Sequence, residues 1–546
     1  IQNNNNHIYT IKNLLYTRIN SLKSSNYIKA LLFGDNKLDK EIKTSYQING
    51  ISHLFSVSGF HINFITSIIY FYLDRVTYNK KIKYITVDIF LVLYLLLCNT
   101  TSLLRCTVMN ILLSINYLLK LDIKKIDIVL LTLILCITIN PFIIYDIGFI
   151  YSYTISFFLI LYKNKYKTNN KLLKIIYISL ISFLVSLPIN IYTSYEINFL
   201  SIILNIIIVP IVSLILLPLS LLTLIFPILD NILYLITSIL EKISLYTSNI
   251  NIFKQVLSKP SIILIIIYYL VIILILSKNK HYYLILILLI FHKTIPLYNS
   301  NLEVVMFDVG EADSMLISTP SKKVNILIDT GRGIDINNII IYLKSIGISK
   351  LNYLIITHGD EDHIGGALYL IDNFKVDNVI LNKGDYTELE VELITHLKNK
   401  NIKYTNNINK IPLLGSYMYL LNTKKFSNEN DNSIVTYFEY RKYKFLFMGD
   451  SSSKTEEYLI NNYNLTNISF LKVGHHGSNT SSSTHFINKI TPKVSLISVG
   501  RNNFYHHPNK EVLTNLSNSV IYRTDINKSI KIKINNKVKI TKLNNN

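Results

Sequence analysis

Long apolar runs, separated by short polar turns, fill the first half of the chain from about residue 53 to residue 297. Each run has roughly 15 to 25 residues, about the length that an α-helix needs to cross 30 Å of hydrocarbon. The run at 198–226 contains Pro210 and Pro218 and is expected to be broken or re-entrant. The pattern predicts membrane-spanning helices at 53–73, 84–98, 103–119, 127–145, 147–162, 175–195, 198–226, 231–250, 261–277 and 282–297.

After residue 297 the pattern changes to short β-like runs that alternate with polar helical stretches, which is typical of a soluble α/β unit. The expected architecture is an N-terminal amphipathic segment (1–52), a polytopic α-helical membrane domain of about ten helices (53–297) and an α/β domain (302–546). Buried strands are predicted at 302–309, 325–330, 353–356, 443–448, 468–473 and 494–499.

Composition agrees with a membrane protein, because 50% of the residues are hydrophobic and only 16% are charged, against about a quarter in soluble chains. The net charge of +21 fits anionic lipid and nucleic acid as partners, and equally fits lysines that set topology in an AT-rich coding sequence. Cys98, Cys106 and Cys136 lie in apolar segments, which excludes a disulfide scaffold and a cysteine zinc site. Because the chain starts with Ile1 and has no signal-peptide pattern, its true N-terminus is expected to lie upstream.

Basic residues concentrate in alternate loops of the membrane region. The positive-inside rule places those loops in the cytoplasm, and an even number of crossings then leaves residues after 297 on the outer face. The alternate set of loops contains only Lys254 and Lys259. The basic set consists of Arg75, Lys80, Lys81, Lys83, Lys124, Lys125, Lys163, Lys165, Lys167, Lys171, Lys174, Lys278 and Lys280.

The most specific chemical signal is the loop 357–366, which follows the strand-like run 353–356 and precedes an apolar helix start. A strand-to-helix loop of this kind places short side chains around one point. Two later strand-like runs end in a carboxylate and in imidazoles, so together the three segments predict a metal site. The residues concerned are His358, Asp360, Asp362 and His363 in the loop, then Asp450, then His475 or His476.

This order of motifs resembles the metallo-β-lactamase fold, in which H-x-[HD]-x-D-H is followed by a strand ending in G-D and by a further His. The match extends over nearly all of 302–535, and its details are similar to the ComEC family of competence channels. Residues 308–313 (DVGEAD) resemble that family's D-V-G-x-G-D opening, with Ala312 in place of the usual Gly. Further matches in the family's order are 328–331, 432–433, 475–478, 498–500, 507–508 and 522–525.

The resemblance implies a set of metal ligands: His358, Asp360, Asp362, His363, Asp450 and one of His475 and His476. His475 is favoured because it lies closer to the strand end. The resemblance also implies catalytic roles for Asp362, Asp450 and His476, with Asp450 bridging two ions. Aspartate at 360, where zinc lactamases have histidine, favours Mn²⁺ over the alternative Zn²⁺, as one or two ions. Lys472, Asn432 and His476 are expected either to bind phosphate or to form local hydrogen bonds.

The start of the membrane region resembles the same family, in residues 50–61 (GISHLFSVSGFH) and 102–105 (SLLR). His53, Ser58 and His61 place polar groups at or inside the membrane, and Arg105 adds a charge near a helix start. Such groups are costly there and are candidates for a pore. Alternatively, Arg105 extends to the membrane interface and the histidines bond to nearby carbonyls. Family members commonly carry an OB-fold domain upstream, for which the chain shows no counterpart.

The family resemblance implies a channel of the bacterial cytoplasmic membrane that takes up DNA in natural transformation. An extracytoplasmic metal-dependent nuclease domain would degrade one strand while the other is translocated. The implied partners are DNA, membrane lipid, a DNA receptor outside and a cytoplasmic motor. Two alternatives remain at this stage: a membrane-tethered metallo-hydrolase of another phosphodiester or ester, and a channel whose domain is catalytically inactive.

Overall fold

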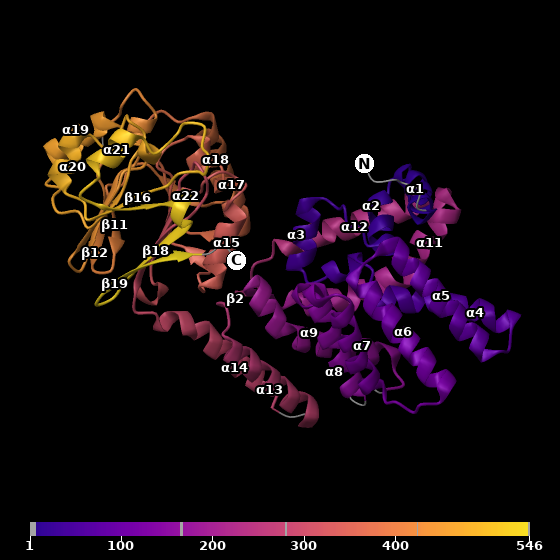
Figure 1. Ribbon diagram of the computed structural model, residues 1–546. Coiled ribbons are helices and arrows are strands. Elements are labelled where there is room, and N and C mark those ends of the chain that lie inside the picture. The colour runs from indigo at the N-terminus through magenta and orange to yellow at the C-terminus, as the bar shows by residue number, and fades with distance from the viewer. Residues whose placement is uncertain (1–6, 164–167, 279–280, 423, 544–546) are drawn as a thin grey trace. The chain divides into compact units, whose positions relative to one another are not determined.

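The computed structural model describes residues 7–163, 168–278, 281–422 and 424–543 of the chain. Lys165, Lys167 and Lys280, which belong to the basic loops noted above, lie outside the described residues. The chain divides into two compact units, one formed by 1–255 and 260–288 and the other by 256–259 and 289–546 (Figure 1). The first is helical and the second is α/β, as the hydrophobic pattern predicts.

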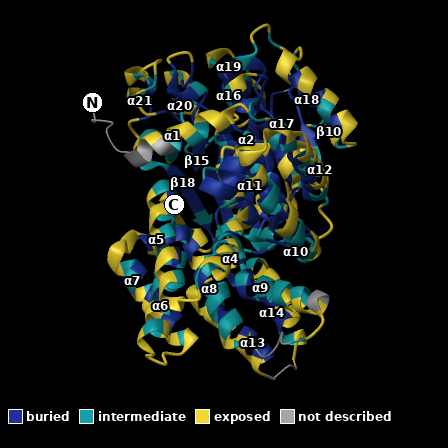
Figure 2. Cartoon of the chain, turned by 90° about the vertical axis from the view of Figure 1, so that its right-hand side faces the viewer, coloured by how far each residue is buried: buried dark blue, intermediate teal, exposed yellow. Residues whose placement is uncertain are grey.

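Among the described residues of the helical unit, three helical stretches are long and apolar enough to cross a membrane: Thr101–Leu119, Leu173–Ser194 and Leu200–Ile225. Shorter apolar helices lie at Ile147–Leu161, Ile262–Ser277 and Tyr283–Tyr298. Many apolar side chains are exposed on these helices, among them Ile263 and Leu270 (Figure 2). An apolar surface of this kind is typical of helices that contact lipid.

The helices of this half of the chain follow one another with short connections. Their bounds are α1 (His7–Asn20), α2 (Ser25–Ile28), α3 (Lys40–Ile48), α4 (Gly59–Val76), α5 (Lys80–Cys98), α6 (Thr101–Leu119), α7 (Lys125–Ile139), α8 (Ile147–Leu161), α9 (Lys171–Ser194), α10 (Leu200–Ile211), α11 (Leu217–Ile225), α12 (Asp230–Ser248), α13 (Ile262–Lys278) and α14 (Tyr283–Thr294), with the short strands β1 (Glu196–Asn198) and β2 (Lys254–Val256).

The expected break in the run 198–226 does not occur. Helix α10 continues through a π-helical turn at Val212–Leu216 into α11, so the stretch is one helix. Pro210 lies inside α10, and Pro218 lies in the first turn of α11. A π-helical turn shifts the hydrogen-bond pattern by one residue, which accommodates prolines that lack an amide hydrogen without interrupting the helix.

The N-terminal segment folds against α12 rather than remaining a separate amphipathic stretch. Asp230, at the start of α12, accepts hydrogen bonds from the backbone amides of Lys23 and Ser24 at 2.7 and 3.1 Å. The Tyr27 hydroxyl donates to Glu241 at 2.8 Å. Glu241, which interrupts the apolar run at 231–250, therefore has its polar partner in the first part of the chain.

The second unit is built from two β-sheets packed face to face, with helices on their outer surfaces (Figure 1). The first sheet has the order β10-β9-β7-β5-β4-β3-β18-β19 and the second β11-β12-β13-β14-β15-β16-β17. The strands of the first sheet are β3 (Leu302–Met306), β4 (Met315–Ser318), β5 (Asn325–Ile328), β7 (Tyr353–Ile355), β9 (Asn378–Ile380), β10 (Lys403–Thr405), β18 (Ser529–Ile534) and β19 (Val538–Leu543). Those of the second are β11 (Lys410–Leu413), β12 (Ser416–Leu420), β13 (Thr436–Tyr440), β14 (Tyr443–Phe447), β15 (Phe470–Lys472), β16 (Val494–Ile497) and β17 (Val520–Arg523).

Both faces of the central strands are buried, which explains why they read as continuous apolar runs. In β5, Ile326 and Ile328 pack in the core between the sheets, whereas Leu327 packs under the outer helices. Strands β5, β7, β9 and β10 are parallel, as are β14 to β17. The outer helices are α15 (Ile336–Ser345), α17 (Ala367–Asn373) and α18 (Glu388–Asn399) on the first sheet, and α19 (Ser453–Asn462), α20 (Thr484–Ile490) and α21 (Lys510–Asn515) on the second.

Candidate metal centre

Four side chains from three loops converge at the carboxyl ends of parallel strands in the second unit. Asp362 and His363 lie on the short helix α16 (Glu361–Ile364), which follows β7. Asp450 follows β14, and His476 lies in the turn that follows β15. Because each of these strands ends at the same edge of its sheet, the loops after them meet and bring the four groups together.

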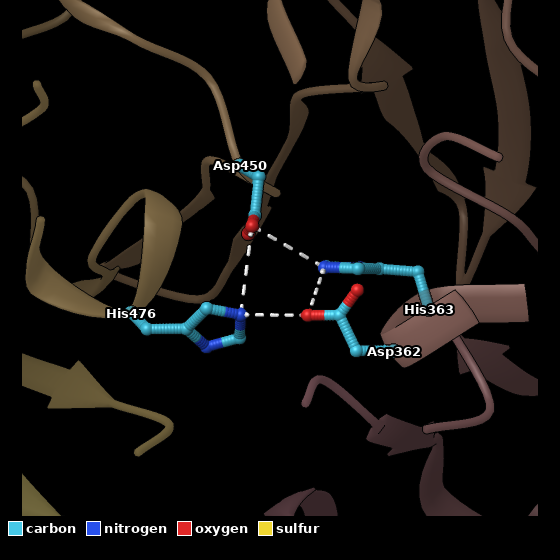
Figure 3. Close-up of side chains that lie close together, drawn as sticks. All are labelled: Asp362, His363, Asp450 and His476. Atoms are coloured by element: carbon cyan, nitrogen blue, oxygen red, sulfur yellow. Dashed lines mark hydrogen bonds and ion pairs between the residues drawn. The ribbon is translucent and has the colours of Figure 1, made fainter. Parts of the chain in front are cut away.

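The four groups are close enough to share one cation (Figure 3). Nε2 of His363 lies 3.4 Å from Oδ2 of Asp450 and 3.8 Å from Oδ2 of Asp362. Nε2 of His476 lies 3.5 and 3.2 Å from the same two oxygens. One ligand atom from each residue lies within 4.8 Å of all the others. Donors about 2.0–2.2 Å from a common ion would have separations of this order.

Buried partners on the far side of each imidazole aim Nε2 into this cluster. Nδ1 of His363 lies 2.8 Å from Oδ2 of Asp329, whose carboxylate also accepts hydrogen bonds from the Thr357 amide and hydroxyl, both at 2.8 Å. Nδ1 of His476 donates to the Ser498 carbonyl at 2.9 Å. Such outer partners fix the tautomer of a metal-binding histidine and leave its other nitrogen free for the ion.

His358 and Asp360, from the same loop as Asp362 and His363, form a further pair of possible donors outside the group of four. Nε2 of His358 lies 3.4 Å from Oδ2 of Asp360, and the His358 and His363 rings are 4.0 Å apart between centroids. Within the described residues, Nε2 of His358, Nε2 of His363 and Oδ1 of Asp450 are buried without a hydrogen-bond partner. Burying a polar atom without a partner is costly, so these atoms fit metal coordination.

The carboxylates and the imidazoles of the cluster shift one another's pKa values in opposite directions: the carboxylates raise those of the histidines, and the histidines lower those of the aspartates. Burial raises the pKa of Asp362, but the hydrogen bond from His476 and the charge of His363 lower it to about 2. Burial lowers the pKa of His476, but Asp450 and Asp362 raise it to about 9. Although burial opposes both shifts, the pKa of His363 is raised well above its usual range, and that of Asp450 is held well below. A divalent cation can replace the protons that these imidazoles hold, so its binding would release protons.

His476, and not His475, joins the cluster, which corrects the preference drawn from the sequence. Both residues have positive φ, 47° and 53°, so the turn after β15 directs the second ring rather than the first toward Asp450. Nδ1 of His475 instead lies 3.0 Å from the Thr480 hydroxyl, and its Nε2 lies 3.5 Å from the Asn430 amide.

Lys472 and Asn432 make internal contacts, so the local alternative of the sequence interpretation describes them. The buried Lys472 ammonium donates to Asp313 and to the Gly449 carbonyl, the latter at 2.9 Å, and lies 3.6 Å from Oδ1 of Asp450. Burial lowers the pKa of Lys472, but Asp313 and Asp450 raise it above its usual value. Asn432 accepts a hydrogen bond from the Phe426 amide at 2.8 Å and shapes the loop before β13.

The polar residues singled out in the helical unit gather where α4 approaches α6. The Ser58 amide donates to Nδ1 of His61 at 3.1 Å, so this buried histidine caps its own helix. Arg105 is only 6% exposed and so does not extend to the surface; it donates to the Ser156 hydroxyl at 3.2 Å. A Cβ at Gly59 would lie 3.1 Å from the Arg105 guanidinium. His53 is exposed on the 3-10 turn Ser52–Phe55.

The two units match different protein families. Residues 31–280 match the family described as Competence protein, and residues 307–501 match the metallo-beta-lactamase superfamily. The chain is similar to ComE operon protein 3 of Bacillus subtilis (strain 168), with 27% identity over 560 residues, which cover 94% of this chain and 72% of that protein. It is also similar to Competence protein ComA of Neisseria gonorrhoeae, with 30% identity over 215 residues, 38% of this chain and 28% of that protein.

Among solved structures, a metallo-hydrolase from the hyperthermophilic archaeon Ignicoccus hospitalis KIN4/I shares 14% identity and a TM-score of 0.30, covering 43% of this chain and 100% of that one.

Proposed function

We propose that this chain, whose helical unit matches the Competence protein family and whose second unit matches the metallo-beta-lactamase superfamily, conducts DNA through the cytoplasmic membrane and hydrolyses one strand at the metal centre. A receptor outside the cell would deliver the DNA, and a cytoplasmic motor would draw the surviving strand inward. The convergence of Asp362, His363, Asp450 and His476 on one point carries the hydrolytic part of the proposal.

In this mechanism the four clustered residues would hold a divalent cation, and His358 and Asp360 would supply further donors next to His363. A cation bound here would polarise a phosphoryl oxygen and lower the pKa of a water molecule for attack on phosphorus. Asp329 and the Ser498 carbonyl keep the imidazoles oriented for it. Lys472 offsets part of the carboxylate charge from the buried side. Aspartate at 360, where zinc lactamases have histidine, raises the share of oxygen donors and so favours Mn²⁺ over Zn²⁺.

We expect the full chain in detergent to hydrolyse end-labelled linear DNA with Mn²⁺, more slowly with Zn²⁺, and not in excess chelator. Hydrolysis would be followed by release of acid-soluble label. Cleavage of a small phosphodiester such as bis(p-nitrophenyl) phosphate, without cleavage of DNA, would favour a membrane-tethered hydrolase of another ester. If neither substrate were cleaved with any divalent metal, the domain would be catalytically inactive. Equal DNA cleavage in excess chelator would contradict the metal mechanism.

Arg105 supports the transport part of the proposal. Its polar contacts within the described residues are neutral, with the Ser156 hydroxyl, with Cys106 Sγ at 3.5 Å and with the Tyr153 ring, whose centroid lies 5.7 Å away. A buried cation surrounded by neutral groups is costly in a membrane protein and can attract a passing anion. A DNA phosphate is such an anion.

Arg105→Ala should lower DNA uptake about tenfold or more while metal-dependent hydrolysis in membranes stays at the wild-type level. Loss of one charge-assisted contact costs on the order of 1.5–3 kcal/mol. An energy of this size slows the passage of DNA about tenfold or more. Uptake is measured as transformation in a competent host that lacks its own channel. Arg75→Ala, which removes an exposed arginine of the same unit, is the matched control. Normal uptake by a folded Arg105→Ala protein would show that Arg105 does not bind DNA during its passage.

The proposed route also requires residues 302–546 to lie outside the cytoplasm, as the basic loops predict. Ser427→Cys places a thiol at an exposed position of the second unit and should react with an impermeant maleimide in intact cells. Asp122→Cys, next to Lys124 and Lys125 in a loop predicted to be cytoplasmic, should react only after lysis. The reverse labelling pattern would show that residues 302–546 lie in the cytoplasm. The native cysteines are first replaced by alanine.

A further inference from the structure

A row of aromatic rings leads from the metal centre to the surface of the second unit. The His476 and His507 rings are 6.5 Å apart between centroids and inclined by 21°, and the His507 and Tyr505 rings are 5.6 Å apart and inclined by 18°. The Phe504 ring follows at 5.9 Å from that of Tyr505. Phe504 is 88% exposed and Tyr505 is 65% exposed. The row therefore begins at a cluster residue and ends in solvent.

The loop that carries these rings is tied to the metal centre by hydrogen bonds. The Asn503 side chain donates to the carbonyls of Gly500 and His507 at 3.0 and 2.8 Å and accepts from the His507 amide at 2.8 Å. The Asn509 amide donates to the carbonyl of Gly477, directly after His476, at 2.8 Å. The rings are thus positioned relative to the cluster without the help of a ligand.

Glu311 fixes the same loop from the other side. One of its carboxylate oxygens lies 2.8 Å from Nδ1 of His507, and the other accepts the Gly500 amide at 2.8 Å. Glu311 belongs to the loop that ends at Asp313, the buried partner of Lys472. His507 is therefore held between the metal cluster and the exposed rings, with part of its ring edge open to solvent.

We infer that the exposed rings of Phe504 and Tyr505, positioned by His507, form a subsite that binds unstacked nucleobases next to the scissile phosphate. The inference rests on the proposed function and specifies its substrate as single-stranded or frayed DNA. Aromatic faces bind bases of any sequence by stacking, whereas bases paired within a duplex present no free face. Arg501 and Lys510, exposed before and after the rings, supply positive charge for the phosphate backbone.

The test compares two single strands of equal length, one of thymidines and one of abasic tetrahydrofuran units, with Mn²⁺ and the full chain in detergent. The wild type should cleave the thymidine strand with about tenfold higher kcat/KM and bind it more tightly by fluorescence anisotropy. The double variant Phe504→Ala/Tyr505→Ala should cleave and bind both strands equally. Phe504→Trp, which keeps an aromatic ring, should retain the preference. The matched control, Tyr417→Ala/Tyr419→Ala, removes two exposed tyrosines of β12 and should also retain it.

Each result bears on a different statement. If the wild type cleaved both strands equally, or the double variant kept the preference, the subsite would be overturned and the nuclease proposal would stand. A double variant that kept the preference but lost binding to phosphatidylglycerol vesicles would assign the rings to lipid instead. A wild type that cleaved neither strand with Mn²⁺ would overturn the proposed nuclease, and the subsite with it.

Discussion

Replacement of Asp450 by asparagine is expected to lower metal-dependent DNA hydrolysis at least about a thousandfold, which corresponds to a loss of about 4 kcal/mol of transition-state stabilisation. Asp450 lies at the centre of the cluster, with Oδ2 3.4 Å from Nε2 of His363 and 3.5 Å from Nε2 of His476. Asparagine has the same shape, so packing is preserved. It removes the negative charge and replaces one of the two carboxylate oxygens by an amide nitrogen, which does not coordinate a metal ion.

Two measurements check this result: the initial rate of DNA cleavage with Mn²⁺, and the metal content of the purified protein by mass spectrometry. Asp385→Asn is the matched control, because Asp385 is an exposed carboxylate that pairs with Lys425 at the surface of the same unit. Its cleavage rate and metal content should equal those of the wild type. An Asp450→Asn protein that kept wild-type metal content and more than a tenth of the rate would place the reaction elsewhere.

Lys472→Met should destabilise the second unit by about 3–5 kcal/mol, because it removes one partner of a buried ion pair. The side chains of Lys472 and Asp313 are 2% and 5% exposed, and Lys472 also donates to the Gly449 carbonyl. Methionine fills nearly the same volume but deprives the buried Asp313 charge of its ammonium partner. For a unit of this size the melting temperature should fall by roughly 10 °C.

A double-mutant cycle separates the charge pair from packing. Lys472→Met/Asp313→Asn removes both charges and should recover most of the lost stability, because no uncompensated charge remains in the interior. Lys454→Met, at an exposed position near the start of α19, is the control and should leave the melting temperature unchanged. The transition is followed by calorimetry of the full chain in detergent. If Lys472→Met and Lys472→Met/Asp313→Asn lowered the melting temperature equally, the hydrogen bond between Lys472 and the Gly449 carbonyl, rather than the charge pair, would account for the stability.

Local features of the sequence were sufficient to locate most of the candidate site. Asp362 and His363 are consecutive residues at the start of one short helix, so their proximity is set by local backbone geometry. Asp450 could be singled out because it directly follows an apolar strand. Position along the chain favoured His475, whereas the structure brings His476 into the cluster, because the choice depends on the backbone angles of a tight turn, which hydrophobic patterning does not report.

Other parts of the site could be recognised only in the folded chain. Asp329 lies 34 residues before His363 yet binds its ring, and Asp313 meets Lys472 across 159 residues of sequence. Both aspartates lie in motifs that the family resemblance marks, but neither motif by itself indicates a partner. His507 likewise gained a role only when its ring was found between His476 and Tyr505. Side chains far apart in sequence meet only through sheet topology and loop packing.

By itself, the sequence determined the fold class, a helical membrane domain followed by a metallo-β-lactamase-type domain, and the comparisons confirm it. It could do so because apolar run length and strand-like alternation are local properties of the chain. Tertiary structure alone decided three further features: the packing of the N-terminal segment on α12, the continuity of the helix through Pro210 and Pro218, and the identity of the histidine that faces Asp450. Each depends on how a backbone turn or a distant element satisfies buried polar groups, and that balance is reached only when the whole core has formed.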